Sequence, residues 1–290
     1  MLRVWFADFW PGFDYTDNFF VSILAESGLR FKVTRLLPNV VIYSCFGDNH
    51  RKYRCCKVYY TGENRRPPLD ECQFAVSFDH IDDPRHLRMP IYVYHAWYMA
   101  RQMGLSGGIG DVLRILTATH SEEQILAGRD RFCSFIFSNG SVERRNAFFH
   151  RLSQYRRVDS AGTWLNNTGF TVRHKAKIDL LRGYKFNIAF ENESYPGYTT
   201  EKILDPMIAG ALPIYWGDPV VSGDFNTGSF LNAGDFESDE DVIEAIIRAD
   251  RDPEVYLSYR RQPWFVDNKP TACWDLDRMR QFFVNVADSI

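Results

Sequence analysis

No apolar run in this sequence of 290 residues is long enough to cross a membrane as a helix. Residues 1–7 also lack the basic start, the apolar stretch and the small-residue cleavage site of a signal peptide, and they read as a first β-strand instead. The sequence therefore predicts no transmembrane segment, and at most peripheral contact with a membrane.

The sequence has no excess of charge of either sign, because 34 basic residues are balanced by 37 acidic ones. Proteins that bind nucleic acid present a basic surface, so we expect no nucleic-acid partner. The P-loop G-x-x-x-x-G-K-[ST], the dinucleotide fingerprint G-x-G-x-x-G and the metalloprotease motif H-E-x-x-H are also missing. The glycines of residues 107–110 have the wrong spacing for the fingerprint and follow no apolar strand, which weakens a nicotinamide oxidoreductase as an alternative.

The six cysteines form no C-x-x-C pair, and four of them lie in apolar segments with the character of strands. This pattern favours buried free thiols over a disulfide framework. Free thiols are typical of a reducing compartment, so the sequence predicts a cytoplasmic location. The cysteines are Cys45, Cys55, Cys56, Cys72, Cys133 and Cys273.

Apolar runs with the length of strands alternate with stretches of helical periodicity, which predicts an α/β fold with mostly parallel sheets. A Gly-rich segment at residues 104–111 is expected to be a loop, and we place a domain boundary near residue 120. Residues 1–120 and 121–290 would then form two Rossmann-like α/β domains facing across a cleft. The predicted strands are 2–9, 30–36, 40–45, 56–60, 74–78, 131–138, 184–190 and 212–216, and the predicted helices are 17–27, 90–102, 142–154, 200–211, 239–249 and 276–287.

The most informative segment is YKFNIAFENESYPGYTTEKILDPMIAGALPIYWGDP at residues 184–219, which reads as strand, polar loop, helix, strand and polar loop. Tyr198, Glu201 and Lys202 fall where the first loop meets the helix. A helix N-terminus offers free N–H groups and the positive end of its dipole, which suit a diphosphate. The lysine adds a full positive charge, and the glutamate can accept hydrogen bonds from a ribose. The segment therefore predicts a site for a nucleotide diphosphate.

A second polar loop, with Ser138 and Arg145, follows the predicted strand at 131–138. Ligands of open α/β sheets bind at the carboxyl ends of the strands, so this loop and the one that contains Asn192 are expected to open into the same cleft. Arg145 and Lys202 would then supply two cations for a diphosphate. Taken alone, each of these residues also fits a simpler explanation, as an exposed helix charge, a turn cap or a core aromatic, and only their combination favours a site.

The segment FNIAFENESYPGYTTEKILDPMIAGALPIYWGDP resembles the donor motif of the α-1,3/1,4-fucosyltransferases, in particular the bacterial members. The similarity extends from about residue 3 to about residue 285. Pro196 departs from the family pattern and is expected to alter the path of the donor loop. Further segments similar to the family follow in the expected order: YTGEN at 60–64, FD at 78–79, LRMP at 87–90, SN at 138–139, RNAF at 145–148 and VDSAG at 158–162.

The resemblance implies a GT-B fold in which residues 1–120 bind the acceptor and residues 121–290 bind GDP-fucose. It implies inverting transfer of fucose to the 3-OH or the 4-OH of N-acetylglucosamine in an N-acetyllactosamine-type glycan. GDP-fucose would be the donor substrate, with no tightly bound cofactor and no required metal. By the same resemblance Arg145 and Lys202 would hold the diphosphate, Glu201 and Tyr198 would contact the ribose or fucose, and Asn192 and Ser138 would line the donor pocket.

The resemblance assigns the general base to Glu63, in the motif YTGEN after the predicted strand at 56–60. A carboxylate at the end of a strand, after a glycine, can reach an acceptor hydroxyl and remove its proton as the new bond forms. The local sequence alone favours an exposed turn residue at Glu63, and only the motif context favours the base.

The acceptor side carries weaker signals. Trp10 and Phe13 lie in the loop after the first predicted strand and are candidates for stacking on a sugar ring, while other aromatic residues nearby are expected in the core. Asp79 and His80 follow the predicted strand at 74–78 and would point toward the cleft, although a lone histidine is more often structural.

The triplet Asp275-Leu276-Asp277 matches the D-x-D pattern that some transferases use for a metal ion, but its place at a helix start favours capping. Two alternatives to a fucosyltransferase stay open from the sequence: a GT-B transferase that uses another GDP-sugar, and a non-catalytic module that binds a nucleotide sugar or a glycan. The sequence leaves the 1,3 or 1,4 linkage and the natural acceptor open.

Overall fold

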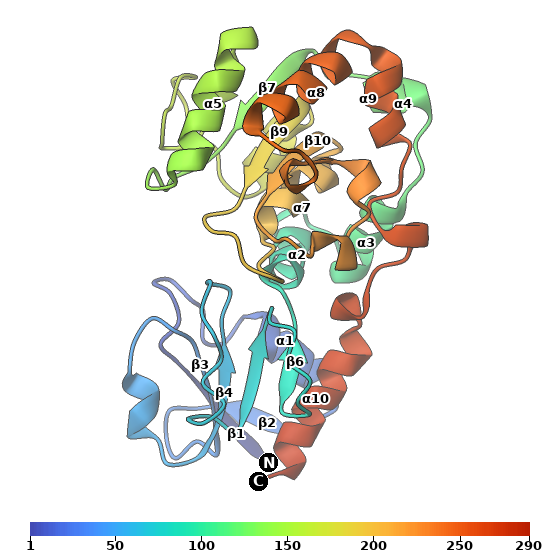
Figure 1. The fold of residues 1–290 in the computed structure, drawn as a ribbon. Helices are drawn as coiled ribbons and strands as arrows, with labels where there is room; N and C mark the ends of the chain where they lie inside the picture. The colour runs from blue at the N-terminus through green and yellow to red at the C-terminus, as the bar shows by residue number, and fades with distance from the viewer. The chain divides into compact units, whose positions relative to one another are not determined.

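The computed structural model describes residues 1–290, which form two compact units (Figure 1). Unit 1 comprises Met1–Tyr94 with Thr271–Ile290, and unit 2 comprises His95–Pro270. Each unit is built on one parallel sheet, of six strands in unit 1 and five in unit 2. This architecture confirms the predicted α/β class with two Rossmann-like domains.

The sheet of unit 1 has the strand order β2-β1-β3-β4-β5-β6, and every neighbouring pair is parallel. All four residues of β3, VVIY, are buried, as expected for a strand of a parallel sheet covered on both faces. The strands are β1 (Leu2–Ala7), β2 (Phe31–Val33), β3 (Val40–Tyr43), β4 (Cys56–Tyr60), β5 (Phe74–Ser77) and β6 (His86–Arg88).

Helices α1 (Phe19–Glu26) and α10 (Leu276–Asp288) pack against each other in unit 1, so the last residues of the chain complete the first unit. The side chain of Asn18 caps α1 by accepting a hydrogen bond from the N–H of Val21, so the helix begins at Phe19, two residues after the predicted start at residue 17. At the start of α10, Asp275 accepts hydrogen bonds from the N–H groups of Asp277 and Arg278. The D-x-D triplet therefore caps a helix, as its position predicted.

The sheet of unit 2 has the order β11-β10-β9-β7-β8 and is also parallel throughout. Its core is rich in aromatic side chains, among them Phe132, Phe135, Phe148, Phe186 and Phe190. The strands are β7 (Arg131–Phe135), β8 (Val158–Ser160), β9 (Tyr184–Phe190), β10 (Leu212–Trp216) and β11 (Leu231–Asn232), and the helices from α3 to α9 are α3 (Ile109–Thr117), α4 (Glu122–Leu126), α5 (Glu143–Tyr155), α6 (Lys175–Leu181), α7 (Glu201–Ala209), α8 (Asp239–Arg251) and α9 (Pro253–Arg260).

The two units divide at Tyr94 and His95, inside α2 (Ile91–Gln102), whereas the sequence placed the boundary near residue 120. The difference has a physical reason, because the later part of α2 and all of α3 pack with the elements of unit 2. The expected loop at residues 104–111 is cut short by α3, which begins at Ile109 and buries Ile109, Val112 and Leu116. Which unit binds which substrate remains a prediction.

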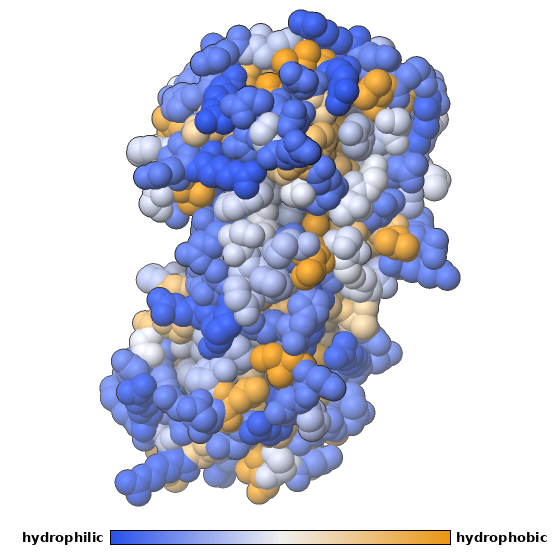
Figure 2. Space-filling model, in the orientation of Figure 1, coloured by the Kyte–Doolittle hydropathy of each residue, from blue (hydrophilic) through white to orange (hydrophobic).

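All six cysteines are free, as the sequence pattern predicted, but only Cys72, Cys133 and Cys273 are buried, whereas Cys45, Cys55 and Cys56 are partly buried. None of the helices combines the length and the hydropathy that crossing a bilayer requires. On the face of the molecule drawn in Figure 2, hydrophobic residues form small groups among hydrophilic ones.

Candidate active site

The candidate donor site lies in unit 2 at the carboxyl edge of its sheet. β7 and β9 are neighbours in the sheet, although β8 separates them in the sequence and pairs with the other side of β7. The strand order therefore reverses between β7 and β9, and ligands of open α/β sheets bind outside the carboxyl ends of the strands at such a switch point. The loops that follow β7, β9 and β10 all begin at this edge.

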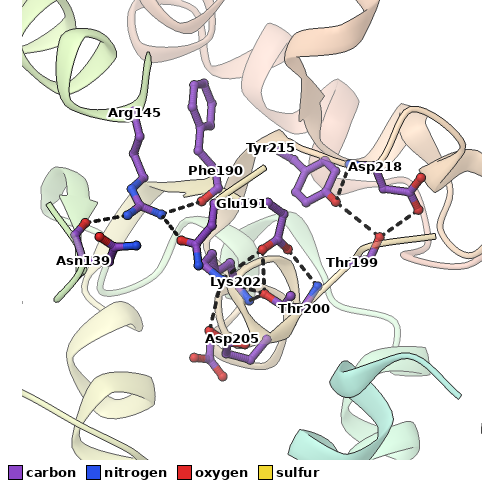
Figure 3. A network of polar contacts seen from close by, with 12 residues as sticks. Asn139, Arg145, Phe190, Glu191, Thr199, Thr200, Lys202, Asp205, Tyr215 and Asp218 are labelled. Carbon is purple, nitrogen blue, oxygen red and sulfur yellow. Dashed lines mark hydrogen bonds and ion pairs between the residues drawn. The ribbon is translucent and has the colours of Figure 1, made fainter. Parts of the chain in front are cut away.

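Arg145, in the first turn of α5, joins the loops on the two sides of the switch point (Figure 3). Its Nη1 donates to the carbonyl of Phe190, at 3.3 Å, and to Oδ1 of Asn192, at 3.0 Å. Its Nη2 donates to the carbonyl of Asn139 at 2.7 Å, and the guanidinium lies 3.9 Å from the ring centroid of Phe137. One side chain thus fixes the ends of β7 and β9 relative to each other.

Arg145 is more deeply buried than a residue that binds a ligand at the protein surface would be. Its side chain is 0% exposed, and burial lowers its pKa to about 10, although Glu191 and Glu201 act to raise it. The guanidinium therefore stays charged near neutral pH and acts on the site through its field and through the loops that it holds. The predicted direct contact with a diphosphate remains a prediction.

Glu191, the first residue after β9, is the anchor of the donor loop (Figure 3). It is 0% exposed, and its carboxylate accepts hydrogen bonds from the N–H of Thr200 at 2.7 Å, the hydroxyl of Thr200 at 2.8 Å and Nζ of Lys202 at 2.9 Å. Gly217 leaves the space for it, because a Cβ at that position would lie 2.4 Å from Cγ of Glu191. The sequence analysis did not assign a role to Glu191; the available signal was an acidic residue directly after a strand that ends in the apolar run Ile188–Phe190.

Lys202 lies in the first turn of α7, and its side chain is 12% exposed. Burial disfavours its charge, but Glu191 and Glu201 outweigh burial and raise the pKa of Lys202. Glu201 is one-third exposed and lies 3.5 Å from Nζ of Lys202. Burial would raise the pKa of Glu201, but Lys202 and the basic groups near α7 lower it to about 2. The start of α7 therefore carries a charged lysine and a charged, partly exposed carboxylate side by side.

The rest of the donor loop is fixed by Asp218, after β10. Its carboxylate accepts hydrogen bonds from the N–H of Gly197 at 2.8 Å and from the hydroxyl of Thr199 at 3.0 Å. Tyr215 adds a third contact, since its hydroxyl accepts a hydrogen bond from the N–H of Asp218 at 3.1 Å. Tyr198 lies within this loop and is only 3% exposed, and its predicted contact with the ribose or fucose stays a prediction.

Asp205 holds the buried side of α7 through charges that come from distant parts of the chain. Its carboxylate contacts Nε2 of His95, in α2, and Nζ of Lys177, in α6, each at 2.7 Å. Asp205 is 2% exposed, so these contacts lie in the interior of unit 2. They fix the rotation of α7 and with it the direction in which Lys202 points. The sequence analysis missed Asp205, because its partners are remote in sequence.

The remaining donor-site candidates differ in exposure. Ser138 is exposed after β7, and Asn192 is half-buried with its Oδ1 engaged by Arg145. The structure therefore brings Ser138, Arg145, Asn192 and Lys202 to the same edge of one sheet, as the sequence predicted from strand ends.

In unit 1, Glu63 follows β4 and is exposed. Its backbone is fixed by Thr61, whose buried hydroxyl accepts a hydrogen bond from the N–H of Glu63 at 3.0 Å and donates to its carbonyl at 3.1 Å. The turn is tight, because a Cβ at Gly62 would lie 2.1 Å from Cδ1 of Ile91. Glu63 thus has a rigid backbone and a carboxylate open to solvent.

The acceptor-site candidates in unit 1 fall into two groups. Asp79 is buried and paired with Arg66 and with the hydroxyl of Ser77, whereas His80 is exposed. Phe13 stacks on Phe9 with 4.0 Å between ring centroids and is only 7% exposed, so it is largely a core residue. Trp10 is half-buried at the edge of the same aromatic cluster and keeps surface for a ligand.

Two family models match this chain. One, described as the N-terminal domain of alpha-(1,3)-fucosyltransferase FucT, covers residues 4–95. The other, described as the C-terminal part of glycosyltransferase family 10 (fucosyltransferase), covers residues 126–284. The chain therefore belongs to glycosyltransferase family 10, the fucosyltransferases.

Individual relatives agree with this family. The chain is 34% identical over 220 residues to the alpha-(1,3)-fucosyltransferase FucT of Helicobacter pylori, which is 69% of this chain and 45% of that protein. It is 33% identical over 149 residues to the putative fucosyltransferase R654 of Acanthamoeba polyphaga mimivirus, which is 48% of this chain and 25% of that protein. The chain spans less than half the length of these relatives.

Solved structures support the fold. A crystal structure of an alpha1,3-fucosyltransferase with GDP-fucose matches with a TM-score of 0.77 and 25% identity, covering 98% of this chain and 90% of that chain. A second crystal structure, of an alpha1,3-fucosyltransferase, matches with a TM-score of 0.81 and 26% identity, covering 99% of this chain and 90% of that chain. Together with the two parallel sheets, these matches confirm the predicted GT-B fold.

The contacts of Asp205 lead to a prediction on stability. Asp205→Asn leaves Lys177 and His95 without their anion, and we expect a loss of about 3–5 kcal/mol near neutral pH. Burial would raise the pKa of Asp205, but Lys177 and His95 lower it from 3.8. The difference in free energy of unfolding between wild type and Asp205→Asn is therefore fully present above pH 3.8. It is lost as the pH falls through the pKa of Asp205 in the folded protein. Urea unfolding at a series of pH values measures it.

The exposed Asp179 provides a matched control, because it pairs with Lys175 and Arg182 on the surface of α6. Asp179→Asn is expected to change the free energy of unfolding by less than about 1 kcal/mol. A loss for Asp205→Asn as small as that of the control would contradict an anchoring role for Asp205.

Proposed function

We propose that this chain is an inverting α-1,3-fucosyltransferase that moves fucose from GDP-fucose to the 3-OH of N-acetylglucosamine in an N-acetyllactosamine-type glycan. The observation that carries the proposal is the fold of an alpha1,3-fucosyltransferase with GDP-fucose, which matches 98% of the chain. The relative from Helicobacter pylori, named an alpha-(1,3)-fucosyltransferase, favours the 1,3 linkage over the 1,4 linkage.

Lys202 and the N-terminus of α7 are the groups suited to hold the donor diphosphate. Glu191 keeps Lys202 charged and in place, whereas Glu201, at 3.5 Å from Nζ and partly exposed, can give way to a phosphate. In this proposal Arg145 holds Asn192 in the donor pocket, with Ser138 at its rim. These cations and the helix dipole oppose the negative charge that develops on the leaving GDP, and they are in place before the reaction begins.

Glu63 is suited to act as the general base. Its side chain makes no hydrogen bond or ion pair, so the carboxylate is free to accept a proton. The acceptor hydroxyl would pass its proton to Glu63 while its oxygen bonds to the anomeric carbon of fucose and the bond to GDP breaks. Attack from the face opposite the leaving group inverts the configuration.

We further propose that no cofactor is tightly bound and that no metal is required, because Lys202, Arg145 and the start of α7 already oppose the charge of the leaving group. The acidic triplet at the start of α10 is engaged in capping through Asp275, which supports the same view. A cytoplasmic location is part of the proposal and is supported by the six free cysteines.

A transfer assay tests the proposed function. The purified chain is incubated with GDP-fucose and, separately, with type 1 and type 2 N-acetyllactosamine, and the product linkage is read by NMR. We expect α-1,3-linked fucose on the N-acetylglucosamine of the type 2 acceptor, at a rate that EDTA leaves unchanged. Transfer only from another GDP-hexose would support the alternative donor, and GDP binding without any transfer would support a non-catalytic module.

The role of Glu63 leads to a kinetic prediction. Glu63→Gln removes the base but keeps the size of the side chain, and we expect kcat to fall by about 10²–10⁴-fold. The affinity for GDP, measured by calorimetry, should stay within about twofold of wild type, because the change touches only proton transfer. Glu71→Gln, at another exposed glutamate of unit 1, is the control and should keep wild-type turnover. Turnover of Glu63→Gln near that of the control would rule the assignment out.

The role of Lys202 leads to a prediction on GDP binding. A charge-assisted hydrogen bond contributes about 1.5–3 kcal/mol, so Lys202→Met should weaken GDP binding by about tenfold to a hundredfold. The single variant also leaves Glu191 buried without its cation, and this lowers stability. A double variant, Glu191→Gln with Lys202→Met, removes both charges and should regain stability without regaining GDP affinity.

Lys175→Met provides the matched control for this experiment, because Lys175 is an exposed lysine of the same unit that pairs only with Asp179. Its GDP affinity should equal that of wild type. If the double variant bound GDP as tightly as wild type, Lys202 would not be part of the diphosphate site.

A further inference from the structure

Unit 2 contains a second polar pocket, separate from the donor site. It has a volume of about 310 Å³ and lies between the end of α3, the end of α9 and the loop that follows α9. Leu116, Pro263 and Trp264 give it an apolar wall. The polar groups that line it are Thr119, His120, Arg260, Arg261, Gln262 and Asn268.

Arg260 is the unusual residue of this pocket, because it is a buried cation with neither a carboxylate nor a carbonyl oxygen as its partner. It is 8% exposed, it forms no salt bridge, and its Nε has no hydrogen-bond partner. The guanidinium lies 4.5 Å from the ring centroid of Trp264 and interacts with the hydroxyl of Tyr256. Burial lowers the pKa of Arg260 to about 10, so the group is still charged near neutral pH.

The neighbouring arginines, Arg129 and Arg261, show how the chain provides acceptors for a guanidinium elsewhere. Arg129 donates to the carbonyls of Ile125, Arg182, Tyr184 and Ala209. Arg261 pairs with Glu122 and with Glu254 at the surface. Arg260 has no hydrogen bond to a carbonyl and no ion pair with a carboxylate, although a buried charge is costly unless it is paired and hydrogen-bonded.

The electrostatic environment of the pocket is positive. Burial lowers the pKa of His120, and the two charged groups that lower it further are Arg260 and Arg129. Of the groups that act on Arg260 itself, Arg129 is a second cation and no carboxylate is among them. Cations also stabilise helix C-termini, and Arg260 lies at the end of α9 close to the end of α7. At the end of α7, however, Arg129 already donates a hydrogen bond to the carbonyl of Ala209 and supplies the cation at that helix C-terminus.

We propose that this pocket binds a small anionic molecule, with a phosphate or carboxylate group held by Arg260 and the remainder of the molecule packed on Trp264. A guanidinium bonds such groups through two parallel N–H donors, which would satisfy Arg260 in full. The hydroxyl of Thr119 and the amide of Gln262 can donate further hydrogen bonds at the rim. The volume is at the lower end of the range for small-molecule sites and suits a molecule of the size of one sugar.

The pocket is distinct from the donor site, because the two lie at opposite ends of α7. Lys202 is in the first turn of α7, and Gly210 caps its last turn. A Cβ at Gly210 would lie 2.5 Å from Nη2 of Arg129 and 3.4 Å from Nη2 of Arg260, so the arginines adjoin the C-terminal end. A helix rises about 1.5 Å per residue, so the length of α7 separates the sites by roughly 13 Å.

Calorimetric titration of the full chain tests the proposal. The probes are inorganic phosphate, glucose 6-phosphate, glucuronate and neutral glucose, each added in excess GDP so that the donor site is occupied. We expect glucose not to bind and at least one anionic probe to bind; the phosphate and glucuronate arms show which anion the pocket prefers. If the chain binds no GDP, the titrations are run without it, so failure of the proposed function does not affect the outcome.

Two variants assign the binding to the pocket. Arg260→Met removes the cation and should abolish binding of the anionic probes. Thr119→Asp places a negative charge at the exposed rim, where folding is not at risk, and should weaken binding by about tenfold or more. Ser258→Asp adds the same charge to the exposed face of α9 outside the pocket and should leave the affinity unchanged. The proposal is overturned if no anionic probe binds to wild type, or if Thr119→Asp binds as wild type does.

Discussion

The buried carboxylate of Glu191 is the interaction on which the donor site of this fucosyltransferase-family chain depends. A charge removed from water needs several strong partners, and here the partners are the backbone and hydroxyl of Thr200 and the ammonium of Lys202. Burial raises the pKa of Glu191, and Lys202 opposes that effect. Satisfying this single charge therefore sets where the donor loop ends, where α7 begins and where Lys202 lies, and it requires a glycine at position 217, directly after β10.

A second constraint connects the two halves of the site through Arg145. The ends of β7 and β9 are far apart in the sequence, and their loops are joined through its guanidinium, at Asn139 on one side and at Asn192 on the other. The positive charges that are proposed to oppose the donor diphosphate thus also fix the loops around the candidate site. Under the proposed function, stability and ligand recognition would depend on the same side chains, which is the arrangement expected of a preorganised electrostatic site.

The sequence predicted the parts of the fold that depend on local pattern. β4, β9 and β10 have the predicted bounds, because each is a mostly apolar run rich in β-branched and aromatic residues. β6 and β8 escaped prediction because three residues carry no periodicity, and their strand geometry comes from the neighbouring strand. For the candidate site, too, local pattern was predictive and distant contacts were not. Lys202 and Arg145 were found from their positions at strand ends and helix starts, but neither the burial of Arg145 nor the pairing of Asp205 with His95 is encoded locally.

Arg145 and Arg260 show why the environment of a charge says more than its residue type. Both are buried, and burial lowers the pKa of each to about 10. Arg145 has two carbonyls and an amide oxygen as acceptors, and the fields of Glu191 and Glu201 favour its charge, so the fold itself accounts for it. Arg260 has an aromatic ring, a phenol and a second cation around it, and these do not balance its charge. No carboxylate of the chain balances that charge, and Arg260 lines a pocket with the volume to admit the small anion proposed above.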